Sequence, residues 1–232
     1  MLFIRLHKKI KTMKYFFVIL FIPHILFAQK DSLLYKMNIV DFMKLPELNK
    51  PIDARNPNNS LIDAALFHLT NEQRILHKLP KFAYSYSLHK ATNEHSEAMI
   101  NQDFYNHENP YSPANRKMTD RIFLYTWEFK EMAENIAQHD ILGGLDEKYC
   151  FEIPRNSQDY VFLNCETKKP LPMRTYTELA RSVVNGWMNS PHHRENILNP
   201  RLKSLACSGR ISKNPFKTKR SPFARLTQDF GG

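Results

Sequence analysis

Apolar residues recur with two different periods along the chain, and this restricts it to folds that combine helices with a sheet. Helical spacing of three to four residues occurs at 61–76, 88–99 and 179–187, whereas strict alternation occurs later, at 205–211 and 224–230. A chain of 232 residues can bury roughly 70% of its unfolded surface, which is enough for one core without staples. We therefore expect one α+β domain, with two domains as the alternative.

Local signals mark where the expected helices begin and end. Ser60 and Ser87 precede apolar stripes, and Thr175 stands three residues before an acid, as in a capping box. A short helix is expected at 113–124, and Pro191 ends the helix that follows Thr175. Residues 131–137 lead into a stretch whose structure is harder to predict, since residues 138–174 have no helical period.

The formal net charge of +10 is concentrated at the two ends of the chain. Residues 1–30 hold six basic residues and no acid, and residues 201–232 hold eight basic residues against one acid, whereas residues 31–200 sum to −3. A slightly acidic body argues against nucleic acid as a partner. Residues 213–220 read as a solvated hairpin loop, with a patch for anionic glycans or phospholipid headgroups as the alternative.

The N-terminus has the features of a secretory signal. Basic residues precede an apolar run at 15–28, which is shorter than the ~20 residues that a transmembrane helix needs. We expect a signal peptide at 1–28, cleaved after Ala28, with Met13 as a possible start; an uncleaved membrane anchor is the alternative. Residues 29–58 form a proline-punctuated lead-in that wraps the domain.

Export makes disulfides possible, and three cysteines leave at least one without an intramolecular partner. Cys150 and Cys165 flank a stretch rich in polar and turn residues, and we expect them to be paired. Cys207 falls on the apolar side of an alternating segment. It is expected to be a buried free thiol, with a Cys–His nucleophile as the alternative.

Several polar residues lie where the expected helices end, among them His107, Glu134 and His193. Their spacing alone does not unite them, since the sequence has no His-Glu-x-x-His pair, nucleophile elbow, phosphate-binding loop or Cys-x-x-Cys. His95 lies on an apolar helical stripe. We interpret it as a hydrogen-bonded core histidine, with a ligand role as the alternative.

Four short motifs occur in an order that resembles the CAP superfamily of cysteine-rich secretory proteins, antigen 5 and plant pathogenesis-related proteins, in its bacterial secreted form. The resemblance covers residues 60–137 and 175–231 and places a CAP domain at 59–232. The motifs are Phe104-Tyr105-Asn106-His107, Glu134-Asn135-Ile136-Ala137, Trp187-Met188-Asn189-Ser190-Pro191-x-His193-Arg194-x-Asn196-Ile197-Leu198-Asn199-Pro200 and Thr227-Gln228-Asp229-Phe230-Gly231.

The resemblance implies a three-layer α–β–α sandwich around a small, mainly antiparallel sheet. It also implies a surface cleft lined by two histidines and two acids, which correspond here to His107, His193 and Glu134. The position of the second acid is Ser190, so the cleft lacks one carboxylate. Asn135, Arg194 and Asn196 are expected to support these groups from behind.

Two imidazoles and one carboxylate suit zinc or another divalent cation, with His107 and His193 as the candidate ligands. The leading hypothesis is therefore a secreted binding protein whose cleft holds a divalent metal or an anionic ligand. One alternative is a metal-dependent hydrolase of peptides or envelope material, with Glu134 as the candidate catalytic base. Another is a lipid-binding or protein-interaction module in which these residues are structural. Lipid, envelope glycan or another secreted protein would be the partner.

Residues 138–174 depart from the bacterial form of the family, in which the segment after Glu134-Asn135-Ile136-Ala137 is short. The apolar and aromatic residues of this insertion are expected to lie close to the cleft. We predict either a lid or recognition loop, or a surface insertion pinned by Cys150 and Cys165.

Overall fold

The computed structural model describes residues 33–144 and 149–232, so the expected signal segment at 1–28 lies outside the described residues. Its main sheet has the order β1-β5-β6-β2, in which only the short β1–β5 pair is parallel. The strands are β1 (Ala83–Tyr84), β5 (Ser204–Ile211), β6 (Phe223–Gly231) and β2 (Met132–Asp140). The two late strands that alternation predicts are confirmed.

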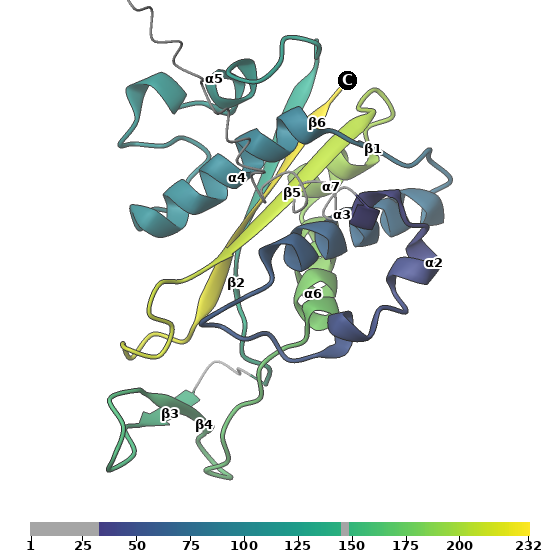
Figure 1. Ribbon diagram of the computed structural model, residues 1–232. Coiled ribbons are helices and arrows are strands. Elements are labelled where there is room, and N and C mark those ends of the chain that lie inside the picture. Colours follow the sequence, from purple (N-terminus) through teal and green to yellow (C-terminus); the bar gives the residue numbers. More distant parts are fainter. Residues whose placement is uncertain (1–32, 145–148) are drawn as a thin grey trace, which may run out of the picture.

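Helices cover both faces of this sheet (Figure 1). On one face lie α4 (Tyr86–Asn101) and α5 (Met118–Phe123); on the other lie α3 (Asn59–Leu76), α6 (Tyr176–Asn189) and α7 (Pro191–Leu198). The side chains of β5 follow this division: Ala206 packs with Leu88 of α4, whereas Leu205 and Cys207 belong to the core beneath α3 and α6. The expected α+β three-layer fold is confirmed.

The larger core lies between the sheet, α3 and α6. Trp187 of α6 is almost fully buried in it, and its indole N–H donates to the Ile136 carbonyl of β2 at 3.1 Å. The N-terminal segment joins this core through α2 (Ile39–Phe42) and η1 (Pro46–Asn49). Phe42 and Leu48 are fully buried there, and Phe42 stacks on His68. In the described part of the chain, no helix has the length and apolarity that crossing a membrane requires.

Two of the predicted helix starts are displaced by two residues. Asn58, rather than Ser60, caps α3, because its side-chain oxygen accepts the Leu61 N–H at 3.1 Å. Ser85, rather than Ser87, caps α4 in the same way. Each cap satisfies a helix-terminal N–H that lacks an intrahelical partner. The capping box at Thr175 is confirmed.

Three further segments differ from the sequence-based expectation or refine it. The helix expected at 113–124 is divided into a 3₁₀ turn, η2 (Pro113–Asn115), and α5. Residues 132–137 form the start of β2, where the buried Glu134 and Asn135 are polar, so that alternation does not reveal the strand. Pro191 does end α6, but it also occupies the first position of α7, where a missing N–H costs nothing.

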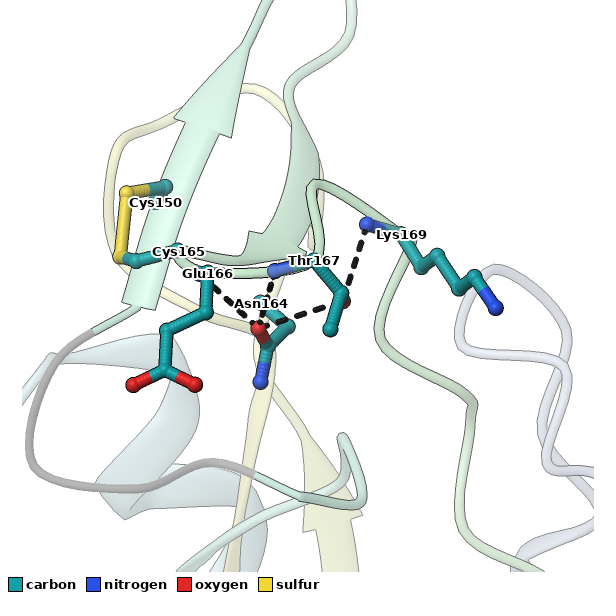
Figure 2. The surroundings of a disulfide bond; sticks show 6 residues. All are labelled: Cys150, Asn164, Cys165, Glu166, Thr167 and Lys169. Carbon is teal, nitrogen blue, oxygen red and sulfur yellow. Dashed lines mark hydrogen bonds between the residues drawn. A yellow bond between two sulfur atoms is a disulfide. The ribbon is translucent and has the colours of Figure 1, made fainter.

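The insertion at 138–174 contains a two-stranded antiparallel hairpin of β3 (Tyr149–Glu152) and β4 (Val161–Asn164). The predicted disulfide between Cys150 and Cys165 is confirmed and joins the start of β3 to the end of β4 (Figure 2). At the same corner the Asn164 side chain accepts the N–H groups of the two residues that follow Cys165. Cys207 is a buried free thiol, as expected, and burial raises its pKa.

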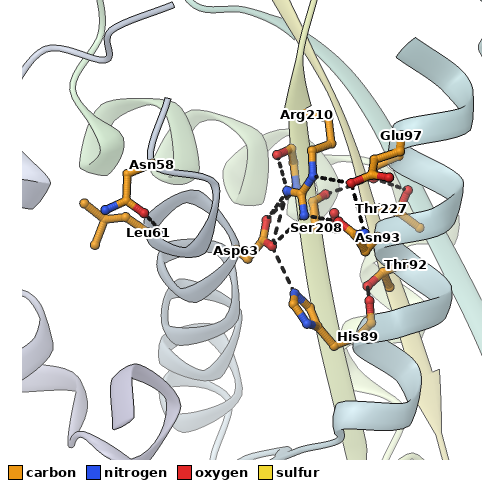
Figure 3. Close-up of polar contacts among 12 residues, drawn as sticks. Asn58, Leu61, Asp63, His89, Thr92, Asn93, Glu97, Ser208, Arg210 and Thr227 are labelled. Atoms are coloured by element: carbon orange, nitrogen blue, oxygen red, sulfur yellow. Dashed lines mark hydrogen bonds and ion pairs between the residues drawn. The ribbon is translucent and has the colours of Figure 1, made fainter. Parts of the chain in front are cut away.

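A buried ion pair ties α3, α4 and β5 together (Figure 3). Asp63 of α3 pairs with Arg210 of β5 at 3.0 Å and accepts a hydrogen bond from His89 of α4 at 3.0 Å. Asp63 also accepts the Gly209 N–H at 2.7 Å. Burial alone would raise the pKa of Asp63, but Arg210 and His89 outweigh burial and lower it. The carboxylate therefore remains charged between the two helical layers.

Candidate functional site

The candidate cleft is built around Glu134, whose place is set by the register of β2 against β6. Glu134 lies opposite Asp229 in this antiparallel pair, on the face that α4 and α5 cover. Only 3% of its side chain is exposed. One carboxylate oxygen accepts the His107 Nδ1–H at 2.8 Å, and the other accepts from the Arg121 guanidinium at 2.5 Å. Both oxygens are thus engaged.

Arg121 of α5 also holds the loop that carries His107. Its guanidinium donates to the main-chain carbonyls of His107 at 3.2 Å and of Arg116 at 3.0 Å, and its side chain is 1% exposed. One buried cation therefore fixes both the carboxylate and the backbone of the histidine that the carboxylate orients. The His107 side chain itself is 52% exposed.

The hydrogen bond from His107 and the charge of Arg121 favour an ionised Glu134 carboxylate. Burial alone would raise the pKa of Glu134, but the His107 hydrogen bond and the Arg121 charge together lower it. Since the carboxylate only accepts, His107 carries a proton on Nδ1, and its Nε2 has no hydrogen-bond partner among residues 33–144 and 149–232.

His193 approaches the same cleft from α7. Burial lowers its pKa, and the nearby imidazoles of His107 and His192 lower it further, so the neutral form is favoured. Asn135 of β2 fixes this part of α7, because its amide donates to the His193 carbonyl at 3.1 Å. Asn196 donates in turn to the Asn135 side chain at 2.8 Å. These two amides link α7 to β2 directly behind Glu134.

The other two residues expected in or near the cleft have different surroundings. The Arg194 guanidinium contacts the His77 imidazole at 3.2 Å. Ser190 lies at the junction of α6 and α7, where its carbonyl accepts the Arg194 N–H at 2.9 Å. The structure thus brings His107, Glu134 and His193 together with two of the three supporting residues.

Sequence reasoning missed the roles of Arg121, which pairs with Glu134, and of Asp229, which lies opposite Glu134 in the β2–β6 register. Asp229 is fully buried, and neither of its oxygens has a hydrogen-bond donor among the described residues. Burial and the Glu134 charge raise its pKa well above the ordinary value, so the neutral acid is favoured. A charged residue at mid-strand between Gln228 and Phe230 was the available signal. No local pattern pointed to Arg121.

His95 forms the floor of this region, and the expectation of a hydrogen-bonded core histidine is confirmed. It is fully buried and donates from Nε2 to the Asn106 carbonyl at 3.0 Å. Burial lowers its pKa to about 4. This bond holds the chain next to His107, so His95 acts on the cleft as a support and not as a ligand.

The arrangement determines how a divalent cation would fit. Among residues 33–144 and 149–232, no three His, Cys, Asp or Glu side chains come together as a metal-binding group. Glu134 has no free oxygen and stands beside a guanidinium, so it suits the carboxylate that orients a metal-bound histidine rather than a ligand. His107 Nε2 and His193 remain as two imidazole donors, which fits a site completed by ligands from solution.

The insertion lies away from the cleft, contrary to expectation. Glu134 is near the start of β2, whereas the insertion leaves from its far end at Asp140. Six residues of strand correspond to about 20 Å. Figure 1 shows the β3–β4 hairpin at the opposite end of the sheet from α5. A lid over His107 and Glu134 is therefore not formed by this segment.

Comparison with solved structures returns bacterial proteins at low sequence identity. An extracellular protein containing an SCP domain from Bacillus anthracis matches 75% of this chain at 20% identity, with a TM-score of 0.46. An outer surface protein from Borrelia burgdorferi matches 72% at 18% identity (TM-score 0.44), over 88% of its own length. A cysteine-rich secretory protein from Staphylococcus aureus matches 75% at 12% identity (TM-score 0.41). The present chain spans 41% of the Bacillus chain and 40% of the Staphylococcus chain.

A search of curated proteins finds no match. The profile of the cysteine-rich secretory protein family, CAP, matches residues 67–217, which is more than half of the chain. That segment contains His107, Glu134 and His193, together with α4, β2, α6 and α7. The chain belongs to the CAP family of cysteine-rich secretory proteins.

Proposed function

We propose that this chain is an exported binding protein whose cleft holds a ligand through the imidazoles of His107 and His193. The observation that carries the proposal is the state of His107. Its Nδ1 is fixed on a buried carboxylate, its side chain is half exposed, and its Nε2 has no hydrogen-bond partner among the described residues. A histidine held in this way presents one oriented nitrogen to a ligand.

A divalent cation such as Zn²⁺ is the first ligand to test. His107 and His193 would hold it, and a bound cation would supply a Lewis acid that attracts anionic ligand groups. The lowered pKa of His193 favours its neutral form, and the Nδ1 bond to Glu134 leaves Nε2 as the ring nitrogen that His107 offers to a ligand. Two protein ligands are fewer than the three or four of tight zinc sites, so we expect modest affinity.

Hydrolysis with Glu134 as general base is the weaker candidate. A general base needs a free oxygen near its substrate and a pKa near the working pH. Both oxygens of Glu134 are already bonded, and its pKa is lowered from the ordinary value. Ser190 also removes the second carboxylate that paired acid–base chemistry requires.

Export is proposed on two grounds. The N-terminal pattern of basic residues followed by a short apolar run is typical of a signal peptide. The Cys150–Cys165 disulfide fits an oxidising compartment.

The decisive experiment is a calorimetric Zn²⁺ titration of the purified protein, beside His107→Ala and His193→Ala. His192→Ala is the matched control, because its exposed imidazole lies on the same helix turn. We expect about one ion per chain, lost in both cleft variants and retained in the control. Glu134→Gln should weaken binding by about 10- to 100-fold, as for other partners of metal-bound histidines. Binding that survives both cleft substitutions would overturn the metal assignment.

A second titration, with inorganic phosphate, distinguishes a metal-binding cleft from one that binds an anion directly. If Zn²⁺ does not bind but inorganic phosphate shifts the NMR resonances of both imidazoles, the cleft holds an anion directly. If neither probe perturbs His107 or His193, the cleft is structural and the proposal fails.

A further inference from the structure

Three segments that the cleft does not use meet at the opposite end of the sheet. They are the N-terminal lead-in near Arg55, the β3–β4 insertion and the basic loop between β5 and β6, and the last two lie close together in Figure 1. The contact is direct: the Tyr160 N–H donates to the Phe216 carbonyl at 2.8 Å, and the Tyr149 hydroxyl to the Lys219 carbonyl at 3.4 Å.

A cavity of about 290 Å³ opens between the lead-in and the basic loop. Its charged lining residues are Arg55, Lys213, Lys217 and Asp159, so it has an excess of two positive charges. Asp159 bridges two of these cations, at 2.5 Å from Arg55 and 2.8 Å from Lys217. The hydrogen bonds from Arg55 and Lys217 lower the pKa of Asp159. The cavity thus already accommodates one carboxylate supplied by the chain.

A second cavity of about 350 Å³ adjoins the first and has a largely apolar lining. Arg55, Asp159 and Phe216 line both cavities and form the wall between them. The Arg55 guanidinium lies over the Phe216 ring, 5.2 Å from its centroid. The apolar lining comes mainly from the insertion, through Leu142, Val161, Phe162, Pro170, Leu171 and Met173.

We propose that the two cavities form one binding site for an anionic amphiphile, whose carboxylate or phosphate head binds at Arg55, Lys213 and Lys217 and whose apolar chain or ring enters the second cavity. Arginine and lysine recognise such heads through charge-assisted hydrogen bonds, and among the described residues the Arg55 guanidinium donates from Nη2 alone, to Asp159. Apolar cavities with a few fixed polar groups are typical of small-molecule sites. The site is separate from His107 and Glu134, which lie at the other end of the sheet.

The internal carboxylate gives the proposal a test in two directions. Because Asp159 competes with an incoming head for the same cations, Asp159→Asn should tighten binding of an anionic amphiphile. Arg55→Gln should weaken it, since the head loses its principal donor. Both side chains are at least partly exposed, so neither substitution threatens the core. Arg201→Gln, at an exposed arginine elsewhere on the surface, is the matched control.

The experiment is a titration of the full protein with octyl phosphate and with octanoate, each kept below the concentration at which it aggregates. Octyl glucoside provides a neutral head on the same chain. We expect both anions to bind more tightly than the glucoside, and Arg55→Gln to reduce their affinity at least fivefold. Hexyl analogues test the apolar cavity, with roughly a fourfold loss for each buried methylene removed. His107→Ala should leave all of these affinities unchanged.

Several outcomes would overturn the proposal. If octyl glucoside binds as tightly as octyl phosphate and octanoate, the anionic head does not contribute to recognition. If inorganic phosphate binds as tightly as octyl phosphate, the apolar cavity does not contribute to binding. Binding to phosphatidylglycerol vesicles without binding of the soluble amphiphiles would indicate a membrane-docking surface instead. An unchanged affinity in Asp159→Asn and Arg55→Gln would place the ligand elsewhere.

Discussion

Replacing Arg121 by methionine tests how the cleft is held together. Arg121 and Glu134 are both almost fully buried and pair at 2.5 Å. Removing one partner of a buried pair leaves an uncompensated charge and costs about 3–5 kcal/mol. In a domain of this size each kcal/mol lowers the melting temperature by about 2–4 °C, so we expect a drop of roughly 6–20 °C.

The pH dependence of this loss has a definite sign. In the wild type the lowered pKa of Glu134 contributes stability above the carboxyl's unfolded pKa, and acidification removes it. In Arg121→Met the lowering effect of the guanidinium is lost while burial still raises the pKa of Glu134, so this pKa lies higher than in the wild type. The destabilisation should therefore be larger at pH 7 than at pH 4.

The assay is urea denaturation at both pH values, with the free energy of unfolding extrapolated to water. Arg201→Met is the control, since Arg201 forms a comparable but exposed pair with Glu131 at 2.8 Å. Exposed pairs contribute about 0–1 kcal/mol, so this variant should be nearly as stable as the wild type. A loss below about 1 kcal/mol for Arg121→Met, or a loss that does not change with pH, would refute the reasoning.

Three further predictions concern other buried or cross-linked groups. Asp63→Asn should cost about 3–5 kcal/mol in urea denaturation, because the buried part of Arg210 loses its carboxylate; a neutral result would show that the pair contributes nothing. Asp229→Asn should gain stability relative to the wild type as pH rises above the ordinary carboxyl pKa, since the raised pKa of the wild-type group opposes ionisation; parallel pH profiles would contradict this. Reducing Cys150–Cys165 should lower the hairpin's local stability by up to about 3 kcal/mol, seen as faster hydrogen exchange in β3 and β4 but not in β6.

The sequence predicted the parts of the fold that have a clear period. The stripes of α3, α4 and α6 and the apolar positions of β5 and β6 predict these elements, because their apolar residues pack into the cores on the two sides of the sheet. The pattern does not give an inward side for β6, since all of its residues are buried. β2 was not predicted, because Glu134 and Asn135 occupy buried positions that a core strand usually fills with apolar residues. These polar residues form part of the cleft, and for the same reason the apolar pattern typical of a core strand is missing from β2.

The candidate site was only partly accessible from sequence. Family resemblance pointed to His107, Glu134 and His193. It included Asp229 in a motif without giving it a role, and it gave no reason to include Arg121. Those two residues reach Glu134 through the packing of α5 and through the β2–β6 register, which are tertiary features. The Arg121 charge nevertheless helps to keep Glu134 ionised, and the Glu134 charge in turn helps to keep Asp229 neutral.

The position of the insertion was predicted wrongly because separation along the sequence was taken as a measure of separation in space. The insertion follows Glu134 by only a few residues, so proximity to the cleft was a natural expectation. A strand, however, carries the chain about 3.3 Å per residue in a straight line. By Asp140 the chain has reached the opposite end of the sheet, where the hairpin packs on the β5–β6 loop instead.

The most direct test of the cleft is an NMR measurement of the His107 and His193 ring nitrogens, made before and during addition of Zn²⁺. The account predicts that neutral His107 carries its proton on Nδ1, where Glu134 accepts it, and that Zn²⁺ shifts Nε2 of His107 together with a His193 nitrogen. A proton on Nε2 of His107, or zinc-induced shifts confined to other histidines such as His192, would contradict it.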